Sequence, residues 1–147
     1  MPDVNNPEIG SDDVIDRAAR LLGHVTVDST ATAGSSSVYR LLSAATTNGN
    51  SIKGSAGNVY GWYITNTNSS PRFVKLYDKA SAPTVGTDTP KLTLVIPGST
   101  TGAGSNISIN PPVPFTTGIA IAITGVVTDA DTTAVALNEV VVNLFYA

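Results

Sequence analysis

The feature that most constrains this chain is a change of period in its apolar residues near His24. Before that point apolar residues recur at helical spacing. After it they alternate in short runs that are broken by Gly, Asn, Pro and Ser clusters. Strand-like runs are predicted at residues 38–45, 51–55, 58–67, 72–80, 91–97, 105–110, 115–127 and 140–146. No helical pattern separates these runs, so parallel βαβ units are excluded and an all-β fold is predicted.

About eight strands at spacings of roughly ten residues are typical of a single antiparallel β-sandwich. A jelly roll is the preferred topology, and an immunoglobulin-like sandwich is the alternative, because strand order cannot be read from one sequence. The predicted domain covers residues 38–147. Residues 1–37 are predicted to form an N-terminal extension with a linker at its end.

The N-terminal extension is expected to contain two parts. Residues 1–10 are polar and hold two prolines, which is typical of an extended arm. Residues 11–23 begin with an N-cap serine and two aspartates and end at a glycine, which predicts a short amphipathic helix. Its apolar stripe consists of Val14, Ile15, Ala18, Leu21 and Leu22. A helix this short is marginal alone, so the stripe is expected to pack on its own domain or on another subunit.

The composition argues against several classes of function. Charged residues make up only 13% of the chain, about half of the usual share, and Ser, Thr, Asn and Gly take their place. The net charge is −3 with scattered Lys and Arg, so no nucleic-acid partner is expected. No run is long and apolar enough for a membrane span, and no export signal is recognised. There is no cysteine, so disulfides and thiolate metal sites are excluded.

The candidates for chemistry are few. The single histidine, His24, has no neighbouring metal ligands, and no Gly-x-Ser-x-Gly motif occurs. Asp78, Asp88 and Glu139 are candidates for a glycosidase pair, but their spacing does not establish a common cleft. The Asp129–Asp131 segment lacks the glycine and the later glutamate of an EF-hand, and is interpreted as a hairpin tip. No enzyme activity, cofactor or metal is therefore predicted.

Two aromatic segments are expected to lie on β-strand faces. Alternation places Tyr60, Trp62 and Ile64 on one face of a strand, and Val59, Gly61 and Tyr63 on the other. One face is expected to pack in the core. In the alternative interpretation, Tyr60, Trp62 and Tyr63 form an exposed surface on which sugar rings stack. A second strand mixes aromatics and lysines on one face, which favours a partly buried contact surface. Its members are Phe73, Lys75, Tyr77 and Lys79.

The last run, residues 140–146, is apolar on both of its faces. Such a strand is expected to lie inside a sheet or to be covered on both sides, by the chain's own helix or by another subunit. An uncovered edge of this composition would aggregate.

Several segments resemble small structural proteins encoded in tailed-phage genomes. They are VYGWYITNT (59–67), RFVKLYDKA (72–80), PTVGTDTP (83–90), GIAIAITG (118–125), DADTTA (129–134) and NEVVVNLFY (138–146). The resemblance covers roughly residue 38 to the C-terminus and is most specific from DKA to VGTDTP. It is to the group that includes capsid decoration (cement) and head-fibre proteins, in which jelly-roll trimers are common.

The resemblance implies a non-enzymatic virion protein and carries no catalytic residue. The expected partners are further copies of the chain, as a homotrimer, and the major capsid protein or other virion proteins. The expected location is the capsid exterior, after synthesis in the host cytoplasm. A carbohydrate-binding or receptor-recognition module of a tail or head fibre is the alternative.

Overall fold

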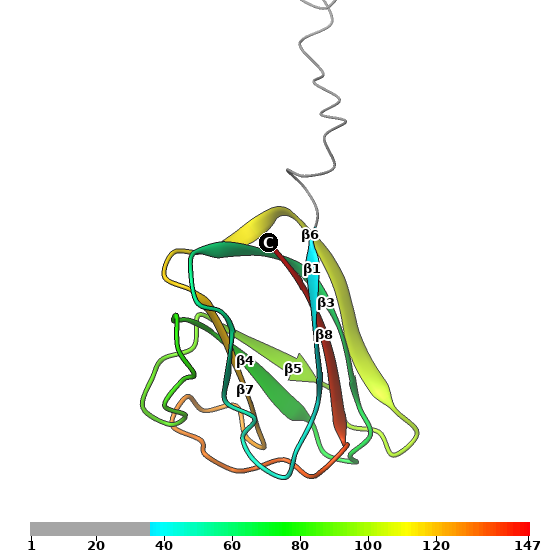
Figure 1. Ribbon diagram of the computed structural model, residues 1–147. Coiled ribbons are helices and arrows are strands. Elements are labelled where there is room, and N and C mark those ends of the chain that lie inside the picture. The colour runs from blue at the N-terminus through cyan, green and yellow to red at the C-terminus, as the bar shows by residue number, and fades with distance from the viewer. Residues whose placement is uncertain (1–35) are drawn as a thin grey trace, which may run out of the picture. The chain divides into compact units, whose positions relative to one another are not determined.

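The fold is known from a computed structural model that describes residues 36–147 (Figure 1). This part of the chain contains eight β-strands and no helix. The strands are β1 (Ser37–Leu42), β2 (Asn50–Lys53), β3 (Gly57–Asn66), β4 (Arg72–Asp78), β5 (Leu92–Ile96), β6 (Ala103–Phe115), β7 (Ile119–Thr124) and β8 (Val140–Tyr146). The predicted arm at residues 1–10 and the predicted helix at residues 11–23 lie outside the described residues.

The eight strands form two four-stranded sheets in which every neighbouring pair is antiparallel. The first sheet has the order β1-β8-β3-β6, and the second has the order β2-β7-β4-β5. The inner faces of both sheets contribute to one hydrophobic core. The prediction of an all-β, antiparallel arrangement of about eight strands is confirmed.

Strand alternation explains which side chains form the core. In β8, Val140, Val142 and Leu144 point inward and are fully buried, as are Val74 and Leu76 of β4. Strand β7 differs from β8 because all six of its residues are buried, so both of its faces are covered. Its alternation of isoleucine and alanine puts the large side chains into the core and the small ones on the outer face.

The last strand only partly fits its expectation. β8 lies inside its sheet, between β1 and β3, as a strand of this composition should. However, its outward residues Val141, Asn143 and Phe145 are only half-buried, so the described part of the chain does not fully cover that face. The strands buried on both sides are β7 and β4 instead.

The boundaries of β6 and β7 differ from the expected ones. β6 extends to Phe115 through three prolines at positions 111, 112 and 114, whereas a break was expected after residue 110. This is physically allowed because Pro111 and Pro112 lie in the irregular stretch between Ser108 and Val113, where β6 is not paired with β3, and because β6 is an edge strand at Pro114. Phe115 therefore belongs to β6, and β7 begins only at Ile119.

An irregularity at Gly61 changes which residues of β3 face the core. The register shifts between Val59 and Gly61, and such a bulge reverses the alternation of faces. Val59 therefore joins Trp62 and Ile64 in the core, and Tyr60 does not. The expectation that Tyr60, Trp62 and Ile64 share a face is wrong for Tyr60, because strict alternation does not hold across a bulge.

Candidate functional site

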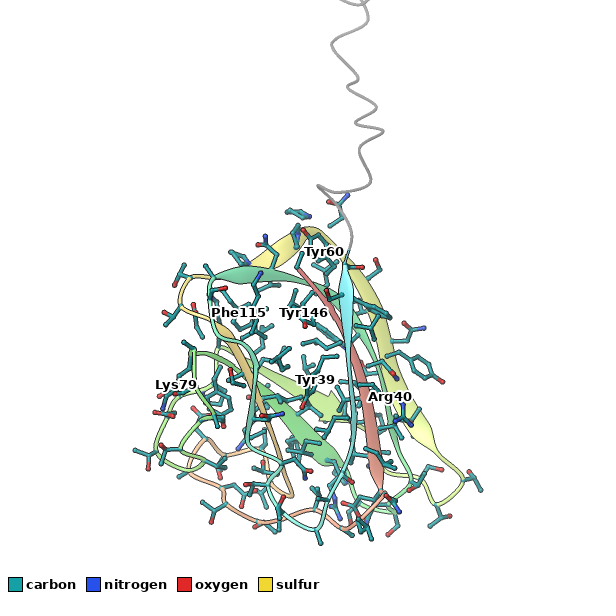
Figure 2. The ribbon with its side chains drawn as sticks, viewed as in Figure 1. Tyr39, Arg40, Tyr60, Lys79, Phe115 and Tyr146 are labelled. Atoms are coloured by element: carbon teal, nitrogen blue, oxygen red, sulfur yellow. The ribbon has the colours of Figure 1, made fainter. Side chains whose placement is uncertain are left out.

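The outer face of the β1-β8-β3-β6 sheet is an open and nearly uncharged surface. The strand register arranges its outward residues in three rows. The rows are Val38–Phe145–Gly61–Ser108, Arg40–Asn143–Tyr63–Asn106 and Leu42–Val141–Thr65–Gly104. Figure 2 shows Arg40 on this outer side and Tyr39, the preceding residue, between the sheets. We call these three rows the open face.

The open face exposes apolar side chains that normally mark a contact surface when they are grouped. Val38 is 58% exposed, Tyr63 is 47% exposed and Leu42 is 41% exposed. Arg40 is the only charged residue in the three rows. The solvent-facing side of a β-sheet normally carries polar and charged residues. A nearly uncharged face with three exposed apolar side chains is therefore unusual for a surface in water.

The outer face of the other sheet is covered by the chain itself over β7 and β4, whereas Val95 on the β5 edge is 55% exposed. Val85, in the 79–91 connection, packs against Tyr77 and the small residues Ala120 and Ala122. The 125–139 connection contributes a carbonyl to the same face, since Lys75 Nζ donates a hydrogen bond to Thr128 O at 2.6 Å. We call this the covered face.

The two covering connections also touch each other. A Cβ at Gly86, where φ is +86°, would lie 2.6 Å from Thr132 Cγ2. Glycine at position 86 therefore allows both the left-handed backbone and this close approach.

The lysine and aromatic residues predicted to contact a partner lie on this covered face. Phe73, Lys75 and Tyr77 are buried, and Lys79 is half-buried in an ion pair with Asp88. The chain's own connections contact Lys75, Tyr77 and Lys79, and three of the four side chains are not presented at the surface. Partner contact by this set remains a prediction from the sequence.

Two buried polar groups of the covered face have few hydrogen-bond partners. Lys75 has no exposed surface, and its ammonium group donates to a single backbone carbonyl. The Tyr77 hydroxyl is buried without a partner. Burial, followed by the nearby charges of Asp129 and Asp88, raises the pKa of Tyr77 to about 12. Tyr77 therefore stays neutral, and its ring serves as packing.

The Asp78 carboxylate is occupied by hydrogen bonds from the chain. It accepts bonds from the backbone N–H groups of Thr116 and Thr117 and from Lys91 Nζ, the last at 3.0 Å. Desolvation favours the neutral acid, but these donors outweigh it and hold the pKa of Asp78 well below its usual range. Asp78 thus fastens the β6–β7 turn and the end of the 79–91 connection to β4.

Asp88 and Glu139 are occupied in the same way. The hydrogen bond from Lys79, with a second from the Thr84 N–H, lowers the pKa of Asp88. Glu139 is buried, which opposes its ionisation, but bonds from Arg72 and Asn68 lower its pKa overall. All three candidate acids of a glycosidase pair therefore have structural partners.

The Asp129–Asp131 segment forms part of a loop that Asp131 organises. Asp131 accepts hydrogen bonds from the Val126 N–H at 2.7 Å and from the N–H and hydroxyl of Thr133. Desolvation opposes ionisation of Asp131, but these bonds outweigh it and lower its pKa. No group of three or more His, Asp or Glu residues within 36–147 is arranged to hold a metal ion.

The aromatic residues of β3 do not form a common platform. Trp62 is buried in the core, and its indole N–H donates to Ser105 Oγ at 3.0 Å. Tyr63 faces outward on the open face, whereas Tyr60 is half-buried beside the bulge. The three rings proposed for sugar stacking are therefore not presented together.

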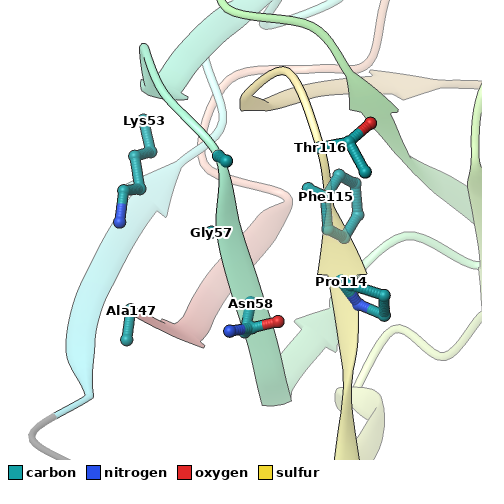
Figure 3. Close-up of a pocket in the computed structure, with 8 residues that line it drawn as sticks. Lys53, Gly57, Asn58, Pro114, Phe115, Thr116 and Ala147 are labelled. Atoms are coloured by element: carbon teal, nitrogen blue, oxygen red, sulfur yellow. The ribbon is translucent and has the colours of Figure 1, made fainter. Parts of the chain in front are cut away.

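A pocket of about 500 Å³ opens at one end of the sheets (Figure 3). It lies between the start of β3 and the end of β6, and Lys53 supplies its cation. Lys91 Nζ, outside this lining, lies 5.0 Å from the centre of the Phe115 ring. The lining residues are Lys53, Ala56, Gly57, Asn58, Pro114, Phe115, Thr116 and Ala147.

The pocket and most of the open face were not anticipated from the sequence. The pocket joins residues that are distant in the chain, so no local signal marks it. The open face had a signal, because Val38 and Leu42 alternate with Tyr39 and Leu41 along one strand.

The remaining predicted site residues lie outside the part of the chain that the structure describes. These are Val14, Ile15, Ala18, Leu21 and Leu22, and His24, for which no site was predicted, also lies there.

Comparison of the chain with protein-family models, with curated proteins and with solved structures finds no match. Among the described residues there is also no helix long and apolar enough to cross a membrane.

Proposed function

We propose that the chain is a non-enzymatic structural protein of a tailed-phage particle, a homo-oligomeric decoration protein that binds the outside of the capsid. The observation that carries the proposal is the open face, in which exposed Val38, Leu42 and Tyr63 accompany a single charge, Arg40. Such a face costs little desolvation when a protein partner covers it. The proposal that this partner is a phage capsid is based on the sequence resemblance to phage decoration and head-fibre proteins.

The fold is further proposed to be a jelly roll. Supporting this, the hydrogen-bonded pairs include β1 with β8, β2 with β7, β3 with β6 and β4 with β5. This nested pairing of the first strand with the last is the pattern obtained when one long hairpin is wrapped into two sheets. Jelly rolls are frequent in viral capsid domains.

The proposed role is mechanical. A protein that binds only the assembled shell shifts the equilibrium toward that shell by mass action. Several weak contacts made by one oligomer add to this effect, because each later contact is intramolecular. The engagement of Asp78, Asp88 and Glu139 by donors of the chain itself is consistent with a structural rather than a hydrolytic use of these acids.

The test is binding to capsids. Purified chain and a variant lacking residues 1–23 are mixed with heads assembled without the protein, and co-sedimentation is measured. The full chain is expected to sediment with the heads. The shortened chain is expected to keep its β-sheet circular dichroism and to lose binding, since residues 1–23 are proposed to reach the capsid or an adjacent subunit.

Two results count against this proposal. If the full chain stays in the supernatant at all concentrations, the decoration role is wrong. If the shortened chain binds as well as the full chain, attachment through residues 1–23 is wrong. A matched control is Arg40→Gln in the full chain, which tests whether binding depends on charge at the open face.

Glycan recognition is the second proposal, and one observation favours it. The pocket combines the Pro114 ring with Asn58 and Lys53, a set that suits a sugar with an apolar face and polar edges. A glycan array is expected to show a ligand that is lost in Asn58→Ala and retained in Tyr63→Ala. Absence of any reproducible ligand removes this alternative.

A further inference from the structure

We propose that the open face pairs with the same face of a second copy of this chain, about a two-fold axis that runs parallel to the strands. The inference goes beyond the proposed function, since it concerns the isolated protein and needs no capsid. It also gives a two-fold contact, in place of the three-fold association expected from the sequence resemblance.

The first argument is that the two halves of the open face differ in side-chain size. The β1 edge presents Val38, Arg40 and Leu42. The β6 edge presents Gly104, Asn106 and Ser108, all small or short and all exposed. The face therefore has a raised edge and a low edge, which is the condition for a surface to be complementary to itself.

A two-fold axis along the strands uses this difference. It places β1 of each copy over β6 of the other, and β8 over β3. Row by row, Val38 comes opposite the partner's Ser108, Arg40 opposite the partner's Asn106, and Leu42 opposite the partner's Gly104. Large side chains then meet small ones, and each guanidinium meets a side-chain amide that can accept its hydrogen bonds.

The second argument comes from charge and selects between two orientations. A two-fold axis across the strands would place β1 over the partner's β1, with Arg40 opposite the partner's Arg40 in the middle row. Like charges that face each other without an acid destabilise a contact. The three rows hold no acidic residue, so the axis along the strands is favoured.

The size of the face sets the expected strength of pairing. Four strands about 4.8 Å apart and three rows about 7 Å apart give roughly 400 Å² in plan. Stable interfaces bury about 800 Å² on each partner. Pairing is therefore expected to be weak and to depend on concentration.

Cysteine cross-linking tests the geometry, because the chain has no cysteine of its own. The full-length double variant Val38→Cys/Ser108→Cys is treated with bis-maleimidoethane at high protein concentration. We expect a covalent dimer, since opposed sheets lie about 10 Å apart. Within one copy the two positions are three strand spacings apart, about 14 Å, so an internal cross-link is disfavoured.

The control is Val38→Cys/Leu42→Cys, which places both thiols on β1. It cross-links efficiently only if the axis runs across the strands, since Val38 then faces the partner's Leu42. A dimer from this control and none from the first variant overturns the proposed orientation. No dimer from either variant overturns the pairing.

A mass measurement separates pairing from cross-linker reactivity. In sedimentation equilibrium the natural chain is expected to rise from one toward two chain masses as its concentration increases. Val38→Glu should keep it near one chain mass. Val95→Glu is the matched control, because Val95 is 55% exposed on the other sheet and should leave pairing unchanged. A natural chain that stays monomeric, or that forms trimers without dimers, overturns the proposal.

Discussion

The outer face of β7 and β4 and the open face of the other sheet are opposites in how they are buried. On the covered face a lysine, Lys75, has no exposed surface. On the open face a valine, Val38, is 58% exposed. From hydropathy alone, the lysine would be expected at the surface and the valine in the interior. The difference comes from the connections, because residues 79–91 and 125–139 are the two longest between strands in the described part of the chain, and both contribute to covering the β4 side.

This contrast shows that burial of an outer face is decided by chain path rather than by the strand's own residues. The covered face achieves it with small side chains: Ala120 and Ala122 leave room beside Lys75 and Tyr77, and Val85 closes over them. Within residues 36–147 no comparable connection covers the open face, and we propose that its apolar residues contact a partner. Substitutions on the two faces should therefore differ in kind.

The largest effect is expected at Gly61, which belongs to the open sheet. A Cβ there would lie 2.2 Å from the backbone oxygen of Ile107, and φ is +156°. Gly61→Ala should lower the free energy of unfolding by about 3 kcal/mol or more, because backbone must move. Urea denaturation measures it. Thr65→Ala, on the same strand and face, should cost less than about 0.5 kcal/mol; similar losses would mean that the β3–β6 approach is loose.

The next prediction compares the loss of stability when a cationic side chain is removed from each face. Lys75→Ala removes a buried aliphatic stem and leaves the Thr128 carbonyl without its donor, at an expected cost of about 2–4 kcal/mol. Arg40→Ala, on the open face, should change stability by less than about 0.5 kcal/mol. Both are measured by urea denaturation at one pH and at a protein concentration low enough to avoid pairing.

Lys75→Met separates packing from charge in this comparison. Methionine keeps most of the stem and removes an ammonium group that has one acceptor. Its cost should be less than half that of Lys75→Ala, since a desolvated charge contributes little net stability. Equal losses for Lys75→Ala and Arg40→Ala would contradict the distinction between the faces.

The strands of this fold could be predicted because their signals are local. Alternation and turn residues identified all eight, and the run at 72–80 corresponds to β4 nearly end to end. The errors have physical causes. Gly61 bulges and moves Tyr60 off the core face, and β6 continues through its prolines because it is an edge strand that is irregular and unpaired at Pro111 and Pro112.

The state of the outer faces could not be predicted, because the covering groups are distant in sequence. Thr128 lies 53 residues from the Lys75 ammonium that it binds. The sequence of a strand with Phe73, Lys75, Tyr77 and Lys79 on one face therefore predicted a contact surface, although three of these side chains are buried, two of them against the connections. In contrast, the exposed valine and leucine of β1 were visible as an alternating pattern, but nothing local shows whether such a face is covered.

The last effect concerns the attachment of the covering connection, and it depends on pH. Asp78 binds Lys91 Nζ, at the end of the 79–91 connection, and the N–H groups of Thr116 and Thr117. Asp78→Asn should cost about 1.5–3 kcal/mol at pH 7, the range for hydrogen bonds to a charged group. The measurement is urea denaturation of both proteins from pH 7 down to about pH 2.

The sign of the pH dependence follows from the lowered pKa of Asp78 in the folded state. Its stabilisation is complete above the unfolded value, near 3.9, and is lost as the pH falls from there toward the folded pKa. The stability gap between natural chain and Asp78→Asn should therefore be constant from pH 7 to about pH 5 and narrow below about pH 4. Asp129→Asn is the control, because it changes an exposed aspartate of the same covered side. If this difference in stability does not narrow at low pH, the negative charge of Asp78 is not what attaches the connection. The covered face would then be as insensitive to acid as the open face.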